Sequence, residues 1–82
     1  MSNQNFTARY FGSASAAAVN QETRTETTVA EFKRAAGSHH GPELVKILEV
    51  ASILVNGQAT QNDDLVIPIG ATIDVLPPFA GG

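Results

Sequence analysis

Residues 53–60 read Ile-Leu-Val-Asn-Gly-Gln-Ala-Thr, and this stretch predicts a β-hairpin in the second half of the chain. Asn56 and Gly57 form the residue pair best able to adopt positive φ at both centres of a tight turn. The apolar run before the pair and the short run after it must then pair as antiparallel strands.

Two amphipathic helices are predicted upstream of the hairpin. Thr28 and Glu31 have the spacing of a capping box, which starts a helix at this point. Its apolar positions keep helical spacing: Val29, Phe32 and Ala36. Gly37 is a natural stop signal, so residues 38–41 are expected to form a loop.

The second helical segment begins at Pro42, a residue suited to the first helical position. Apolar side chains then recur at i, i+3, i+4 and i+7, namely Leu44, Ile47, Leu48 and Ala51. The pattern fits either a separate helix or a kinked continuation of the first one.

Strands are expected on both sides of the helical middle. Residues 6–11 alternate, with one side formed by Phe6, Ala8 and Tyr10 and the other by Thr7, Arg9 and Phe11. Residues 12–18 form either a loop or a short helix, and residues 23–28 predict a short, largely solvated strand.

The last strand is predicted over residues 72–76, with Ile73 and Val75 facing inward and Leu76 outward. Before it, residues 68–70 predict a type I turn with proline at the second position. Two prolines follow the strand and cannot donate to a ladder, so residues 77–82 are expected to project as a tail.

Length and composition favour one domain over residues 1–82. The chain has 82 residues, of which 43% are hydrophobic, enough for a single core but not for two. Strands, then helices, then strands again indicate an α+β fold with helices packed on one sheet face, the order found in small β-grasp domains.

Charge and cysteine content exclude several classes of function. The net charge is −3 and the five basic residues are scattered, which disfavours a nucleic-acid partner. The absence of cysteine removes disulfides, thiolate zinc sites and a thiol nucleophile. No apolar window approaches the roughly 18 residues of a membrane span, and the polar N-terminus lacks a leader pattern, so we expect a soluble cytoplasmic chain without a membrane partner.

The chain ends in Leu76-Pro77-Pro78-Phe79-Ala80-Gly81-Gly82. This ending, the strand order, the Asn-Gly hairpin and the turn at residues 68–72 together resemble the small subunits of molybdopterin synthase, which are ubiquitin-like sulfur carriers. The resemblance covers nearly the whole chain after Asn5. It implies a ubiquitin-like β-grasp fold with a mixed sheet, whose first and last strands are parallel neighbours.

The resemblance also implies a reaction at Gly82. Its carboxylate would be adenylated with ATP by an E1-like adenylyltransferase, converted to a thiocarboxylate, and used to place sulfur in the dithiolene of molybdopterin. The partner in that step would be the large synthase subunit, giving a hetero-oligomer. The chain itself would then be a co-substrate that binds no cofactor and is not catalytic alone.

The chemistry of the tail is consistent with this role. An α-carboxylate has a pKa of about 3.5, so at neutral pH it is a poor electrophile until it is activated. Gly81 and Gly82 lack side chains, so with Ala80 and Phe79 they would form the part that threads a partner's channel. Six residues from Pro77 reach at most about 20 Å. The alternative is a frayed terminus without chemistry.

A partner interface is predicted beside the base of the tail. Phe11 and Leu76 have outward parity on strands that a β-grasp fold places side by side. The resemblance implies that they dock the large subunit together with the adjoining Pro77 and Pro78. Ala59 occupies the third matching position and is smaller here. The alternative is a pair of ordinary surface hydrophobes.

His39 and His40 are adjacent in a glycine-flanked segment where a loop is expected. Their side chains should point apart and no third ligand is recognisable, so a solvated loop is favoured over a metal site. Asp63 and Asp64 lack the alternating oxygen ligands of a calcium loop and favour a turn.

Three other functions share parts of this pattern. A related carrier for thiamine or another thiolation pathway would use the same tail. A ubiquitin-like protein modifier would join Gly82 to a lysine through an isopeptide bond. A non-covalent interaction domain would have an inert tail.

Overall fold

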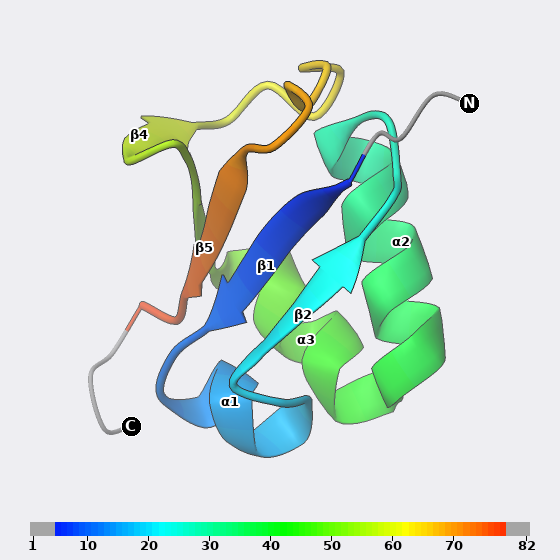
Figure 1. Cartoon of the computed structure of the whole chain (residues 1–82). Helices are drawn as coiled ribbons and strands as arrows, with labels where there is room; N and C mark the ends of the chain where they lie inside the picture. The colour runs from blue at the N-terminus through cyan, green and yellow to red at the C-terminus, as the bar shows by residue number, and fades with distance from the viewer. Residues whose placement is uncertain (1–4, 79–82) are drawn as a thin grey trace.

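The computed structural model describes residues 5–78 and arranges their strands in one mixed sheet of order β2-β1-β5-β3-β4 (Figure 1). The strands are β1 Phe6–Tyr10, β2 Gln21–Arg24, β3 Ser52–Val55, β4 Gln58–Thr60 and β5 Thr72–Leu76. The helices are α1 Ser13–Ala17, α2 Val29–His40 and α3 Pro42–Val50. The central pair β1 and β5 is parallel and the other three pairs are antiparallel.

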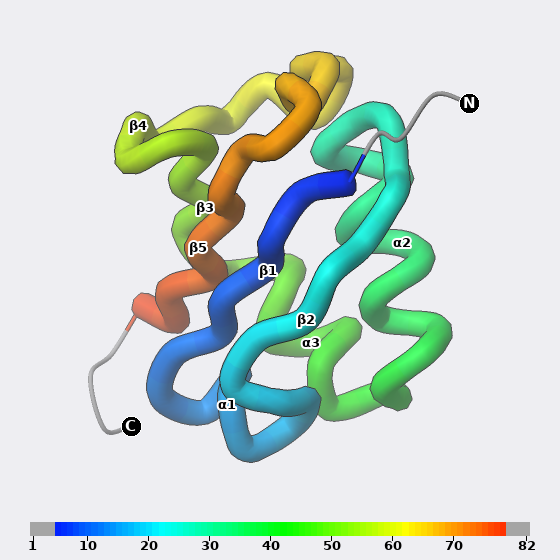
Figure 2. Tube along the Cα trace, in the orientation of Figure 1, coloured from blue at the N-terminus to red at the C-terminus, as the bar shows by residue number. Residues whose placement is uncertain are grey.

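Helices α2 and α3 lie on one face of this sheet, and β3 lies next to β5 (Figure 2). The predicted ubiquitin-like β-grasp fold, with its parallel first and last strands, is therefore confirmed. The core forms between the two layers. Phe32 of α2 is fully buried and meets Phe6 edge to face, with ring centroids 5.6 Å apart.

The predicted hairpin is confirmed. Asn56 and Gly57 have φ values of 51° and 84°, and Val55 pairs with Gln58. Asn56 also ties the turn to β5, because its amide donates to the Thr72 carbonyl (2.8 Å) and its side-chain oxygen accepts from the Thr72 amide (3.0 Å). The asparagine thus sets both the turn and its attachment to the sheet.

Helix α2 begins as predicted, with the Thr28 hydroxyl accepting from the Glu31 amide (3.2 Å). The predicted end is wrong, since α2 continues through Gly37 to His40. Gly37 is buried against α3, where a Cβ atom would lie 2.8 Å from Cγ2 of Val45. This glycine allows close helix packing, and the helix instead ends at Gly41, whose φ is 115°.

A single residue therefore separates α2 from α3, and the predicted loop over residues 38–41 is wrong. Pro42 occupies the start of α3, as expected, so the second segment is a helix of its own. Residues 12–18, for which a loop and a short helix were both open, contain α1.

Two other boundaries also differ from the sequence-based expectation. The strand expected over residues 23–28 is β2, which begins at Gln21 and ends at Arg24. The Thr27 carbonyl accepts from the Ile67 amide (2.8 Å), so the residues after β2 no longer pair with β1 and contact the segment before β5 instead.

In the predicted type I turn, the Ala71 amide donates to the Pro68 carbonyl (3.1 Å) and Gly70 has a φ of 80°. Pro68 is thus the first residue of that turn, and glycine supplies the positive φ that a type II turn needs.

None of the helices formed by residues 5–78 has the length and apolar character needed to cross a bilayer.

Candidate functional site

The base of the predicted tail follows directly from β5. Leu76 ends that strand, Pro77 is half-buried and Pro78 is exposed. Pro77 lies beside Gly12, where a Cβ atom would be 3.8 Å from the proline Cγ. Phe79, Ala80, Gly81 and Gly82 lie outside the described residues, so the roles predicted for them remain predictions.

Phe11 and Leu76 lie side by side on the sheet face opposite the helices. Tyr10 pairs with Val75 in the parallel register, and both of these side chains are buried. The next residue on each strand therefore points outward, and the Phe11 amide donates to the Val75 carbonyl (3.2 Å). Phe11 is 39% exposed and Leu76 is half-buried. The sequence predicted this juxtaposition correctly.

A charged pair borders these two apolar side chains. Arg9 Nε donates to Asp74 Oδ1 (2.7 Å) and its Nη2 donates to Oδ2 (2.9 Å). The bidentate carboxylate raises the pKa of Arg9, and the guanidinium carbon lies 5.6 Å from the Phe11 ring centroid. The ion pair thus holds a cation beside the exposed ring.

The sequence analysis did not single out Arg9 and Asp74. A usable signal was present, because both have outward parity and opposite charge on strands expected to be neighbours, and the structure pairs them directly. Together with Phe11, Leu76 and Pro77 they form what we call the tail-root surface. An apolar centre with a polar border is typical of protein docking surfaces.

Ala59 lies on the same sheet face but not within the tail-root surface. It is exposed on β4 and pairs with Leu54 of β3. Leu54 in turn pairs with Asp74 of β5, so β3 separates Ala59 from the tail-root surface. The interface role predicted for Ala59 therefore remains a prediction.

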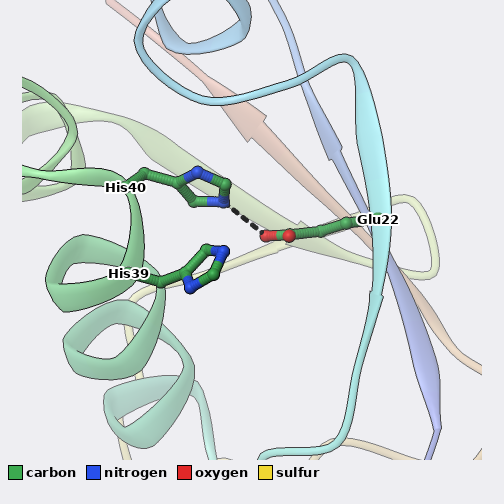
Figure 3. A group of neighbouring side chains, drawn as sticks. All are labelled: Glu22, His39 and His40. Carbon is green, nitrogen blue, oxygen red and sulfur yellow. Dashed lines mark hydrogen bonds and ion pairs between the residues drawn. The ribbon is translucent and has the colours of Figure 1, made fainter.

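A second group of side chains gathers where the end of α2 faces β2 (Figure 3). His39 and His40 lie in the last turn of α2, so the solvated loop predicted for them is wrong. A third candidate ligand, which was not recognisable in the sequence, lies next to them in the fold. Glu22 of β2 places a carboxylate oxygen 2.9 Å from His40 Nε2, and one ligand atom from each of the three residues lies within 4.8 Å of the others.

Glu22 is held by three donors. The Tyr10 hydroxyl donates to Oε2 (2.7 Å), Arg24 Nη1 lies 3.0 Å from the same oxygen, and His40 is the third. Burial raises the pKa of Glu22, but the three hydrogen bonds outweigh burial and leave the pKa below its ordinary value. Burial, with the Glu22 carboxylate, raises the pKa of Tyr10. Hydrogen bonds from Arg24 to Glu26 and Glu22 raise the pKa of Arg24.

Sequence reasoning missed Glu22 for two reasons. It lay outside the strand expected over residues 23–28, and it is 17 residues before His39 and 18 before His40, so only the tertiary fold brings the groups together. Its alternation with Arg24 was the available signal, since both side chains face the helix layer once β2 starts at Gln21.

The strand order and the helices on one face of the sheet define a ubiquitin-like β-grasp domain, and known structures show the same fold. SAMP1 from Haloferax volcanii is similar with a TM-score of 0.78 and 19% identity, over 95% of this chain and 99% of that one. A chain from the complex of subunits 1 and 2 of the molybdopterin-converting factor from Helicobacter pylori 26695 is similar with a TM-score of 0.71 and 24% identity. The match covers 95% of this chain and 99% of that one. A protein described as a putative molybdopterin converting factor, subunit 1, from Pyrococcus furiosus is similar with a TM-score of 0.77 and 21% identity. The match covers 92% of this chain and 98% of that one.

The family model named ThiS family matches residues 8–82. The chain therefore belongs to the ThiS family, and it is a ubiquitin-like sulfur carrier of that family. No protein of curated function matches the sequence.

Proposed function

We propose that this sulfur carrier is the small subunit of molybdopterin synthase and supplies the sulfur of the molybdopterin dithiolene. The observation that carries the proposal is the tail-root surface, whose apolar centre of Phe11, Leu76 and Pro77 lies at the base of a segment that ends in Gly81-Gly82. The similarity to two chains named for the molybdopterin-converting factor supports it.

The proposed chemistry takes place at the Gly82 carboxylate. In an E1-like adenylyltransferase this carboxylate attacks the α-phosphate of ATP, pyrophosphate leaves, and the resulting acyl-adenylate has a good leaving group. A donor that supplies sulfur at the sulfide level then attacks the acyl carbon, the C–O bond to AMP breaks as the C–S bond forms, and a thiocarboxylate remains. ATP is bound by the activating enzyme, and this chain requires no cofactor of its own.

The described residues contribute binding and positioning. Phe11 and Leu76 would bury their exposed surface against the large synthase subunit, and apolar contact contributes about 25 cal/mol per Å² removed from water. The Arg9–Asp74 pair limits the positions of the Phe11 ring before docking. Pro77 and Pro78 restrict the base of the tail, which reduces the entropy lost when the tail enters a channel.

A reconstituted sulfur-transfer assay tests the proposal. The thiocarboxylated chain, the large subunit of molybdopterin synthase and the sulfur-free precursor are mixed, and dithiolene product is measured. We expect product from the wild-type chain and none from a control chain carrying one extra residue after Gly82. An inactive wild-type thiocarboxylate would contradict the assignment to this synthase.

The family match favours a second candidate, a carrier for thiamine or another thiolation pathway. The same thiocarboxylate would then donate sulfur to a thiazole synthase instead of the molybdopterin synthase large subunit. Running both acceptors in parallel discriminates the two, because the true partner should give product at a far lower carrier concentration. A protein modifier would instead yield conjugates of higher mass in cell lysate.

A further inference from the structure

We propose that Glu22, His39 and His40 form a binding site for one divalent transition-metal ion of the zinc class, which would join the end of α2 to the edge strand β2. The proposal goes beyond the sulfur-carrier function and does not depend on it. None of the three residues belongs to the tail-root surface. The site is instead defined by the convergence of ligand atoms from two elements (Figure 3).

The ligand set suits such an ion. Imidazole nitrogens bind zinc, copper and nickel well, and one carboxylate oxygen completes a common three-ligand set that leaves a fourth position for water. Tetrahedral zinc places its ligand atoms about 3.4 Å apart. Here they lie within 4.8 Å of one another, so side-chain shifts on the order of 1 Å would complete the geometry.

The two histidines can face one ion although they are adjacent in sequence. Their rings are 4.6 Å apart and nearly perpendicular, at 86°, and both lie on the side of α2 that faces β2. His39 is exposed and free to adjust, whereas the His40 side chain is only 10% exposed and packs against the Tyr10 ring at 5.9 Å. One ligand is thus fixed in place and the other can close on the ion.

The carboxylate is oriented in advance by residues behind it. The hydrogen bonds from Tyr10 and Arg24 both use Oε2 and can persist while Oε1 binds an ion. His40 Nε2 must give up its proton and its own hydrogen bond to Oε2 in order to become a ligand. Such outer contacts fix the position of a metal ligand. The nearby cation Arg24 is also paired with Glu26 through bonds of 2.8 and 2.9 Å, so its charge is shared between two carboxylates.

Titration calorimetry with Zn²⁺ tests the proposal, using the full chain without a polyhistidine tag in a non-chelating buffer. We expect one Zn²⁺ per chain and no heat from Mg²⁺ at the same concentrations, because Mg²⁺ prefers oxygen ligands. With Co²⁺ as the probe, the visible absorption bands of a low-symmetry cobalt site should develop to the same stoichiometry. Zinc should also raise the melting temperature, since it binds the folded state.

Three variants separate this site from general surface binding. His39→Gln removes an exposed ligand without disturbing the core, and Glu22→Gln keeps an acceptor for Tyr10 while removing the charge. Each should weaken Zn²⁺ binding at least about tenfold. Glu43→Gln, an exposed carboxylate in the first turn of α3, should leave binding unchanged.

Circular dichroism of each variant establishes that it is folded before titration. If the wild-type chain binds no Zn²⁺, or if His39→Gln and Glu22→Gln bind it as tightly as Glu43→Gln does, the proposal is wrong. The cluster would then be a metal-free hydrogen-bond network.

Discussion

The contact between α2 and α3 and the centre of the tail-root surface both contain apolar side chains, but the first is closed at the buried Gly37, whereas the second is open at Phe11. At the helix contact, Gly37 leaves no room for a Cβ atom beside Val45. At the tail-root surface, Phe11 is 39% exposed although its backbone is fixed by the sheet. The first region is explained by folding alone, whereas the second presents an ordered apolar surface whose contact, on our proposal, comes from a partner.

The two regions should therefore respond oppositely to substitution. Changes at the helix contact should lower stability and leave sulfur transfer per folded molecule intact. Changes at the tail and its root should lower transfer and leave stability intact.

Deleting Gly82 should have the largest effect, because it moves the terminal carboxylate to Gly81, one residue short of the proposed reacting position. Sulfur transfer should be abolished in the reconstituted assay. Thermal unfolding should barely change, since the residue follows the last strand by six positions. Full transfer by the deletion variant would show that the reaction does not require a carboxylate at Gly82.

Gly81→Val should reduce both adenylation and sulfur transfer on the order of 100-fold. A β-branched side chain restricts the backbone and would clash with a narrow channel, which displaces the reacting carbon. Pyrophosphate exchange reports the first reaction and dithiolene formation the second. Loss of only the first would place the tight passage in the activating enzyme, and wild-type rates in both would indicate a tail without a channel.

Gly37→Val should lower the free energy of unfolding by about 1 to 3 kcal/mol, because added methyl groups overpack the helix contact. Chemical denaturation measures the loss. Ser38→Val is the matched control on the exposed side of the same helix and should change the free energy of unfolding by less than about 0.5 kcal/mol, because Ser and Val have similar helix propensities. Equal losses in the two variants would mean that the contact with Val45 is not tight.

Phe11→Arg should weaken binding of the large subunit at least about tenfold, or about 1.4 kcal/mol, because a charge would be buried only in the complex. Ile69→Arg is the control, since Ile69 is 69% exposed in the turn before β5, at the opposite end of that strand from Leu76. Surface plasmon resonance of the folded variants measures the affinity. Unchanged affinity for Phe11→Arg would remove this surface from the interface.

Local signals predicted much of the fold and of the tail-root surface. Asn56-Gly57 specifies its turn through backbone conformation alone, and strand alternation places Phe11 and Leu76 outward without any knowledge of the core. What failed depended on partners distant in sequence. Gly37 looked like a helix stop because its packing against Val45 is invisible in a local pattern.

The histidine cluster shows the same limit from the functional side. The adjacent positions of His39 and His40 in the sequence argued against their binding one metal ion together. Glu22 lies next to them only because β2 and the last turn of α2 meet in the tertiary fold. The sequence also predicted β2 too far along the chain. The β-branched threonines that indicated a strand extend beyond Arg24, where β2 ends, to Thr28, which caps α2.

The most direct test of the sulfur-carrier account is the mass of the C-terminal peptide after co-expression with an E1-like activating enzyme and a sulfur donor. We predict a species heavier than the unmodified peptide by about 16 Da, because one carboxylate oxygen of Gly82 is exchanged for sulfur. It should be absent when the activating enzyme is omitted. Only the unmodified mass, under conditions in which that enzyme forms acyl-adenylate on this chain, would contradict a thiocarboxylate at Gly82.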